Sequence, residues 1–300
     1  MITSKIKRKS FDDKENLLVH LIMVILSMCC FIPFLYLVSI SLSNEMDISY
    51  FGYQLIPKKL DFSGYKYVLG DPTAIINAYE FTAFTSIAGT VISVCMMTLM
   101  AYPLSIRNYK LRRFWAFYLF ITMIFQGGLA ANYIVRVIYL GMKDTIWVFL
   151  LPGAVNAFHV ILIRTFFQGL PEEMMDAAKI DGANHMYIFA RISLPLSKPV
   201  LATVALFQLL GKWNDWMTCN LYVTEAKDKV TLQYLLQTIL KNIEVMQTMQ
   251  ERGIAVDLSA IPSESSRMAM AVLAAGPMIA VFPFFQKYFA KGLTVGSLKG

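Results

Sequence analysis

The sequence predicts an all-α integral membrane protein with six transmembrane helices. Three observations lead to this fold class: 57% of the 300 residues are hydrophobic, only 16% are charged, and the apolar residues gather into six long runs. Soluble domains carry roughly 25% charged residues, and their apolar residues recur at the short periods of half-buried helices and strands. Because lipid offers the backbone no hydrogen-bond partner, helices are the natural structure for such runs.

The six runs define the order of the predicted crossings. Each allows on the order of 20 residues, enough to cross a hydrocarbon core of roughly 30 Å at about 1.5 Å per residue. The first run follows a short tail, residues 1–16, and is too long for the apolar core of a signal peptide, so we expect it to remain as a helix. Residues 17–300 then form one transmembrane domain. The predicted crossings are Leu17–Ser43, Phe81–Leu104, Phe114–Leu140, Thr145–Phe167, Pro199–Thr218 and Met268–Phe289.

Charged residues between the runs predict the orientation of the chain. Lysine and arginine gather in the tail before Leu17, in the loop from Arg107 to Arg113 and in the tail after Phe289, whereas the alternate loops are neutral or mildly acidic. By the positive-inside rule, both termini and the loop after the fourth run are cytoplasmic, and the loop at 220–267 is external. No basic stripe with interleaved aromatics occurs outside the runs, so a nucleic-acid partner is not expected despite the net charge of +7.

The predicted cytoplasmic loop, residues 169–198, has the punctuation of a helix–turn–helix. Glu172 and Glu173 fall in the first turn of the first helix, where carboxylates meet the positive end of the helix dipole. Gly182 permits the turn that ends this helix. A second short helix is expected over Asn184–Ser193, before two prolines redirect the chain into the fifth run. From this punctuation alone, the loop is either a well-capped linker or a docking element.

One motif in this loop is specific enough to suggest a family. It reads Asp176, Ala177, Ala178, three residues, Gly182, nine residues, Ile192, one residue, Leu194 and Pro195. This resembles the EAA loop of ABC-importer permeases, which has glutamate at the first position and which docks on a cytosolic ATPase subunit. The resemblance implies that Asp176 is the charged contact, that the two alanines form a close-packing surface, and that Gly182 is the hinge. Aspartate is one methylene shorter than glutamate, so the two preceding glutamates can share the contact.

The fifth run carries polar residues before its expected outer end. Gln208, Lys212 and Asp215 lie at i, i+4 and i+7 and so share one helix face, and Lys212 can pair with Asp215. Such residues either face a path through the membrane or mark its external surface, where tryptophans form an aromatic belt. The tetrapeptide Trp213-Asn214-Asp215-Trp216 is similar to a motif of carbohydrate-importer permeases of the maltose-transporter type. That resemblance favours a substrate path lined by Gln208, Lys212, Trp213, Asn214, Asp215 and Trp216.

Two further segments complete the predicted organisation. In the external loop, apolar residues from Val230 to Ile243 recur every three or four positions, which predicts an amphipathic helix that lies on the membrane or packs over the permease. In the resembled family this loop reaches into a substrate-binding protein. The polar tract 247–266 after the helix is expected to be mobile. The ending from Phe282 to Gly300 resembles the C-terminal pattern of the same family, with its Phe-Gln-Lys-Tyr-Phe, Gly-Leu-Thr and Gly-x-x-Lys-Gly elements.

The resemblance covers most of the chain and implies a MetI-like permease subunit of an importer for a carbohydrate, an oligosaccharide above all, in the bacterial cell membrane. It implies a second homologous permease, two cytosolic ATPase subunits that bind ATP and Mg²⁺, and an external binding protein as partners. No phosphate-binding loop and no metal-ligand spacing of cysteines or histidines occurs, so we expect no enzyme, cofactor or metal site in this chain. A secondary transporter and an intramembrane enzyme are the alternatives, but the runs show neither mid-membrane carboxylates nor a paired nucleophile and base.

Overall fold

The computed structural model describes residues 13–226, 228–252 and 262–296, and every regular element in this part of the chain is a helix. The chain divides into two units, residues 1–70 with 243–273 (unit 1) and residues 71–242 with 274–300 (unit 2). Most of the predicted tail and of the Gly-x-x-Lys-Gly ending lies outside the described residues. The α-helices and the two π-helical turns, η1 and η2, are α1 (Asp13–Ser41), α2 (Glu45–Phe51), α3 (Ser63–Val68), α4 (Pro72–Ser105), α5 (Arg112–Ile124), α6 (Gly128–Ile134), η1 (Val135–Tyr139), α7 (Trp147–Leu150), α8 (Ala157–Gln168), α9 (Glu172–Ile180), α10 (His185–Ile188), η2 (Phe189–Ser193), α11 (Leu194–Leu196), α12 (Lys198–Trp213), α13 (Met217–Tyr222), α14 (Leu232–Glu251) and α15 (Ser263–Gly296).

The described helices include apolar spans suited to a multi-pass membrane protein. α1, α4 and α15 each contain an unbroken span. Two further spans are bent pairs: α5 with α6 and η1, at 114°, and the segment from α10 to α11 with α12, at 76°. Another apolar helix, α8, has only 12 residues. These segments follow the order of the six predicted runs and confirm the fold class. The third run is bent, the fourth is interrupted between α7 and α8, and the fifth is preceded by a bend at Ser197.

Glycine and proline explain where two of the predicted runs break. The third run bends at the pair Gly127-Gly128 between α5 and α6, where Gly128 adopts a φ of +76°, a region that favours glycine. The fourth run breaks around Pro152 and Gly153, where Gly153 has a φ of +72°, and leaves the short helices α7 and α8. Both breaks consist of uncharged residues, so the length of an apolar run does not reveal them.

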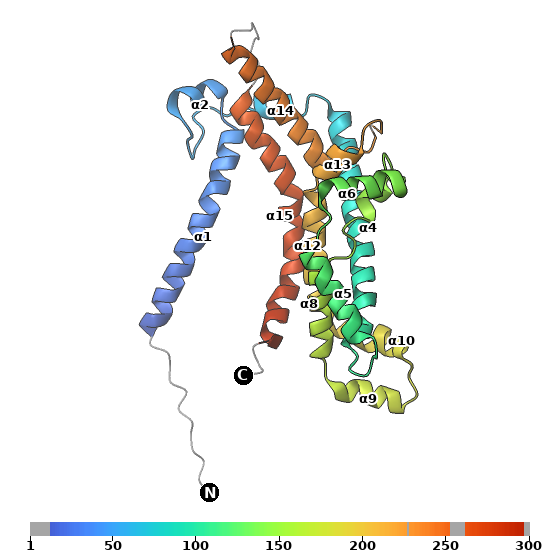
Figure 1. Cartoon of the computed structure of the whole chain (residues 1–300). Coiled ribbons are helices and arrows are strands. Elements are labelled where there is room, and N and C mark those ends of the chain that lie inside the picture. Colours follow the sequence, from blue (N-terminus) through green and yellow to red (C-terminus); the bar gives the residue numbers. More distant parts are fainter. Residues whose placement is uncertain (1–12, 227, 253–261, 297–300) are drawn as a thin grey trace. The chain divides into compact units, whose positions relative to one another are not determined.

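Unit 2 is built around α4, which packs against α8 and α12 (Figure 1). Small residues let transmembrane helices approach closely, and the buried face of α4 is rich in them. The exposed side of α4 instead carries the large apolar residues Phe84, Ile87 and Val91, as expected for a surface that meets lipid or a partner helix. The buried small residues of α4 include Ala78, Thr82, Thr85, Ser86, Gly89, Thr90 and Ser93.

The two ends of α4 carry different loops. Figure 1 shows α9 and α10 near the C-terminal end of α4, whereas α6 and α13 lie toward its N-terminal end. Near α13, the Asp144 carboxylate accepts hydrogen bonds from the backbone N–H groups of Thr224, Glu225 and Ala226 at 2.7, 3.1 and 3.3 Å. These hydrogen bonds, that of Thr224 above all, lower the pKa of Asp144 to about 2. The loops predicted on opposite sides of the membrane thus lie at opposite ends of unit 2.

The predicted amphipathic helix is present as α14. Leu232, Leu236 and Ile243 are buried, and the backbone N–H of Leu232 donates to the Thr82 hydroxyl of α4 at 2.8 Å. The first turn of α14 therefore packs over the permease, which is one of the two alternatives that the sequence left open. α14 continues to Glu251, into the tract predicted to be mobile, and residues 253–261 of that tract lie outside the described residues.

Unit 1 joins α2 and α3 to the start of α15. The Glu45 carboxylate accepts hydrogen bonds from the backbone N–H groups of Glu264 and Ser265, at 2.9 and 3.2 Å. It also accepts from the hydroxyl groups of Ser263 and Ser265, at 3.2 and 3.1 Å, and so caps the N terminus of α15. Gly64 of α3 packs so closely that a Cβ atom there would lie 2.7 Å from the carbonyl carbon of Ser265. The apolar side chains of α1 are exposed over most of its length.

Candidate functional site

The loop that resembles an ATPase-docking element forms two short helical arms, of which α9 is the first. Glu172 and Glu173 lie in its first turn, as predicted. No residue of α9 is buried, and only Met175 and Ala178 are half-buried, so a partner can reach most of the helix. The Lys179 ammonium donates to the Asp176 carboxylate at 2.8 Å, which confirms that these charges share one face. Ala177 is exposed beside Asp176. Because its side chain is only a methyl group, a partner can approach the helix backbone closely there.

Gly182 ends the first arm through its backbone conformation. Its φ is +81°, in the left-handed region. The N–H of Gly182 donates to the carbonyl of Lys179 at 3.0 Å, and the N–H of Ala183 donates to that of Ala178 at 2.9 Å. This pair of hydrogen bonds is a Schellman motif, with glycine at the position where its missing Cβ matters. No atom lies within 4 Å of where a Cβ would stand, so backbone geometry alone requires glycine here.

The second arm joins the loop to the packed core of unit 2. Asn184 caps it, because its side chain accepts a hydrogen bond from the backbone N–H of Tyr187 at 2.8 Å. The predicted helix is present as α10 followed by the π-helical turn η2. Ile188 and Phe189 are buried, and the Phe189 ring lies 4.8 Å from that of Tyr102 on α4. The second arm is thereby packed against α4, the helix that organises unit 2.

The last residues of the motif face different surroundings. Leu194 is half-buried and packs against the core cluster that contains Phe189, and Ile192 is half-buried in η2. Pro195 is exposed and lies inside α11. The chain changes direction at Ser197, between Pro195 and Pro199, as the sequence predicted. A proline in the first turn of a helix needs no backbone donor, so Pro195 is accommodated without a kink.

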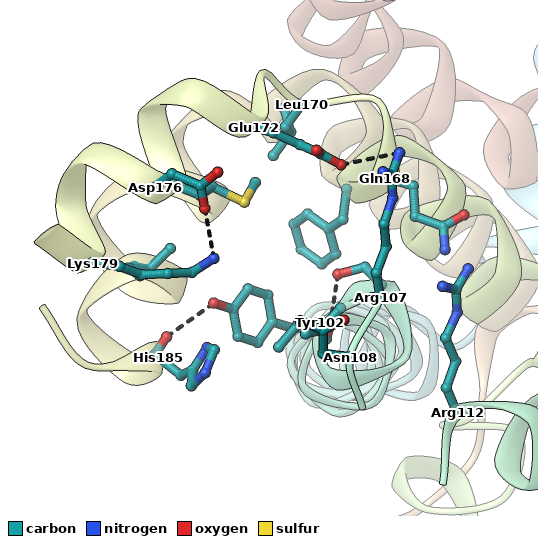
Figure 2. Close-up of a pocket in the computed structure, with 15 residues that line it drawn as sticks. Tyr102, Arg107, Asn108, Arg112, Gln168, Leu170, Glu172, Asp176, Lys179 and His185 are labelled. Atoms are coloured by element: carbon teal, nitrogen blue, oxygen red, sulfur yellow. Dashed lines mark hydrogen bonds and ion pairs between the residues drawn. The ribbon is translucent and has the colours of Figure 1, made fainter. Parts of the chain in front are cut away.

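Two contacts hold the loop against the end of α4 and border a cavity of about 430 Å³. The Tyr102 hydroxyl donates to the carbonyl of His185 at 3.1 Å, and Arg107 pairs with Glu172 at 3.1 Å (Figure 2). The side chains of this ion pair are 78% and 58% exposed, so we expect it to contribute only about 0–1 kcal/mol. The sequence reasoning used Arg107 only as a sign of orientation and missed both contacts, although the basic loop beside an acidic helix start was a signal.

The polar residues of α12 do not form the predicted ion pair. The Lys212 ammonium donates to the carbonyl of Phe149 at 3.0 Å and lies 3.5 Å from that of Leu150, at the end of α7. The Asp215 carboxylate instead accepts from the backbone N–H of Thr218 at 2.9 Å and starts α13. The pair does not form because the unpaired carbonyls at the end of α7 attract the cation, while the first turn of α13 needs an acceptor.

The other predicted path residues have neighbours of their own. The Gln208 amide lies 3.2 Å from Nδ1 of His159 on α8. Trp213 is buried, and its indole N–H donates to the carbonyl of Ala274 at 2.9 Å. Asn214 accepts a hydrogen bond from Gln233 of α14 at 3.1 Å, and Trp216 is half-buried with the Lys241 ammonium 5.5 Å from its ring centroid. In this conformation Trp213 supports packing and presents no open stacking face, so a role in the substrate path stays a prediction.

The comparisons with known proteins agree with this architecture. The family described as "Binding-protein-dependent transport system inner membrane component" matches residues 72–295. Protein LplC of Bacillus subtilis is 37% identical over 270 residues, which are 90% of this chain and 89% of LplC. The polygalacturonan/rhamnogalacturonan transport system permease protein YtcP of the same organism is 35% identical over 98% of this chain and all of YtcP. A crystal structure of a bacterial ABC transporter involved in the import of the acidic polysaccharide alginate superposes with a TM-score of 0.76 and 28% identity, covering 96% of this chain and 100% of that one.

The apolar spans fit a multi-pass membrane protein, and the family match makes it a membrane subunit of a transport system. The chain belongs to the family of binding-protein-dependent transport system inner membrane components, since the family match covers 72–295 and the relatives align over most of both chains. Members of this family are permease subunits that act together with an ATPase and a substrate-binding protein. The expected MetI-like fold is therefore confirmed.

Proposed function

We propose that this chain is the permease subunit of an ATP-binding-cassette importer that moves an oligosaccharide into the bacterial cytoplasm. The single observation that carries this proposal is the exposed α9, closed by the left-handed Gly182, at one end of a membrane unit whose family serves binding-protein-dependent transport. Carbohydrate as the substrate class is supported by the relative named for polygalacturonan and rhamnogalacturonan and by the structure described for alginate import.

The loop at 169–198 serves as the docking element for a cytosolic ATPase. Glu172 pairs with Arg107 and Asp176 with Lys179, whereas Glu173 is exposed and has no ion pair or hydrogen bond from its side chain in the described part of the chain. Glu173 is thus the carboxylate free to meet a cation on the ATPase, and it compensates for the short side chain of Asp176. The exposed Ala177 lets the partner approach the helix closely, because a methyl group adds little height.

The remaining partners follow from the same assignment. Both termini lie in the cytoplasm, a second homologous permease completes the path, and two ATPase subunits bind ATP and Mg²⁺ outside this chain. An extracytoplasmic binding protein delivers the sugar to the end of unit 2 that carries α13 and α14. ATP binding closes the ATPase pair and turns the helices outward through the docking loop, and hydrolysis resets them. The chain itself performs no chemical step.

The substrate path runs beside α12 in this proposal. Lys212 and Gln208 occupy one face of α12, and both make contacts with neighbouring helices that an outward-facing state would have to exchange. If the side chains of Lys212 and Gln208 exchange partners between two states of the transporter, they can form hydrogen bonds with sugar hydroxyls in one of these states. Trp216, half-buried near Lys241, is the aromatic residue placed best to meet a sugar ring.

Reconstitution tests the proposal. Proteoliposomes with this chain, its second permease, the ATPase subunits and the binding protein should accumulate labelled oligosaccharide only when ATP is present. Replacing Ala177 with tryptophan should block docking and abolish uptake, whereas the small substitution Ala177→Ser should leave most of it, because it adds little bulk to the exposed helix. Uptake that persists without ATPase subunits would indicate a secondary transporter and would contradict the proposal.

A further inference from the structure

The cavity beside α9 contains an arginine that no acidic group neutralises. Its lining includes four basic side chains, and two of them are paired: Arg107 with Glu172 and Lys179 with Asp176. Arg112 lines the same cavity, and its guanidinium makes no ion pair or hydrogen bond within the described residues. Figure 2 shows Arg107 and Arg112 on one side of the cavity and Asp176 and Lys179 of α9 on the other.

A second arginine adds to the unbalanced charge. The positive charges of Arg164, on α8, and of Arg112 interact unfavourably, although Arg164 does not itself line the cavity. The Nε atom of Arg164 is buried and has no hydrogen-bond partner. Two cations that repel each other and have no anion between them are costly, and an anion bound by Arg112 relieves that cost.

The position of this cluster identifies the source of the anion. Arg112 is the first residue of α5, and the cavity lining also includes Tyr102 and Ser105 in the last turn of α4 and Gln168 at the end of α8. Three apolar helices therefore begin or end around the cavity, as expected for a site at the level of the lipid headgroups. On α5, directly after the arginine, Phe114 and Phe117 are 60% and 63% exposed and present apolar surface for acyl chains.

We propose that this cavity binds the phosphate of an anionic phospholipid headgroup, held by Arg112 with support from Arg107. The guanidinium group matches the geometry of phosphate oxygens and forms two parallel hydrogen bonds with them. Basic pockets between membrane helices are known to hold anionic headgroups. Arg107 also contacts Glu172 at the start of α9. A lipid held by Arg112 and Arg107 therefore lies between the loop before α5 and the loop that carries α9. The lipid site thus rests on charge and position, independently of the transported substrate.

Native mass spectrometry of the purified full-length chain in detergent tests this site. The probes are dioleoyl phosphatidylglycerol, dioleoyl phosphatidylcholine and inorganic phosphate alone. The variant Arg112→Gln removes the charge, and Arg113→Gln is its matched control, because Arg113 is the next residue, is exposed and does not line the cavity. Arg112 has no partner within the described residues, so its replacement is not expected to unfold the chain, and the melting temperature of both variants checks this.

The expected result is one tightly held phosphatidylglycerol, with affinity reduced about fivefold or more in Arg112→Gln and unchanged in Arg113→Gln, since a basic side chain near an anionic leaflet contributes about 1 kcal/mol. Phosphatidylcholine should bind more weakly, and inorganic phosphate in excess should not displace the lipid. Equal lipid binding in both variants, or displacement by inorganic phosphate, would overturn the proposal. Unchanged lipid binding, together with loss of the ATPase when Arg112→Gln is purified in the presence of its ATPase subunits, would assign Arg112 to the protein interface and would also overturn it.

Discussion

Replacing Gly182 with valine should weaken ATPase docking without preventing membrane insertion. Gly182 has a φ of +81° and closes the Schellman motif that ends α9. No atom lies within 4 Å of where a Cβ would stand, so the substitution causes no collision in the folded state. Its whole cost comes from holding a β-branched residue in the left-handed region.

That cost sets the size of the expected effect. A non-glycine residue in the left-handed conformation costs roughly 1–2 kcal/mol, and asparagine tolerates it better than other residues. Because about 1.4 kcal/mol corresponds to a tenfold change in an equilibrium constant, the docking-competent loop should become about 5- to 30-fold less populated in Gly182→Val. Gly182→Asn should lose much less, since asparagine can adopt the required backbone conformation.

Co-purification of the ATPase subunits and ATP-dependent uptake in proteoliposomes measure this loss. Both should fall strongly in Gly182→Val and only slightly in Gly182→Asn, while the amount of chain in the membrane stays at the wild-type level. Normal docking and uptake in the valine variant would refute the reasoning. A loss in the asparagine variant as large as that in the valine variant would show that the space beside residue 182 matters and not its backbone conformation.

Three further predictions concern the close packing at Gly64, the helix cap at Glu45 and the loop contacts of Asp144. Gly64→Val should destabilise the chain by about 1–3 kcal/mol, because a Cβ atom there lies 2.7 Å from the Ser265 backbone; thermal unfolding in detergent measures the loss, and a wild-type melting temperature would disprove this packing. Glu45→Gln should also lower the melting temperature, by an amount corresponding to about 1–3 kcal/mol, since the charged cap of α15 becomes neutral; an unchanged value would show that the cap contributes nothing. The pKa of Asp144 is lowered to about 2 from its ordinary 3.8, so its contribution to stability is complete above about pH 4 and is lost as the pH falls through 2. Asp144→Asn should remove this part of the acid dependence, and identical melting curves of wild type and variant between pH 4.5 and 2 would contradict it.

Local patterns allowed the sequence to predict the fold class and the docking loop. The length of an apolar run can be read directly from the sequence. The start of α9, the turn at Gly182 and the cap at Asn184 each depend on residues within a few positions. These features form from neighbours in sequence, so the order of the residues is enough to locate the motif and its helices. The family resemblance of the same residues was confirmed by the match over 72–295.

Contacts between distant residues could not be predicted in this way. Lys212 meets the carbonyl of Phe149, 63 residues away, and not the nearby Asp215. Glu45 accepts hydrogen bonds from Glu264 and Ser265, which lie 219 and 220 positions further along the chain. Each choice of partner depends on which helix ends are brought together, and helical spacing within one segment does not contain that information. The bends at Gly128 and Gly153 were missed for another reason, because glycine interrupts a helix without interrupting an apolar run.

Cysteine labelling of intact cells tests most directly whether the docking loop faces the cytoplasm. In a variant without Cys29, Cys30, Cys95 and Cys219, a single cysteine replaces the exposed Asp181 beside the hinge or the exposed Glu225 at the other end of unit 2. We predict that a membrane-impermeant maleimide labels Glu225→Cys in intact cells and labels Asp181→Cys only after the membrane is permeabilised. Rapid labelling of Asp181→Cys in intact cells would place the loop outside, where no ATPase can reach it, and would contradict the proposed coupling.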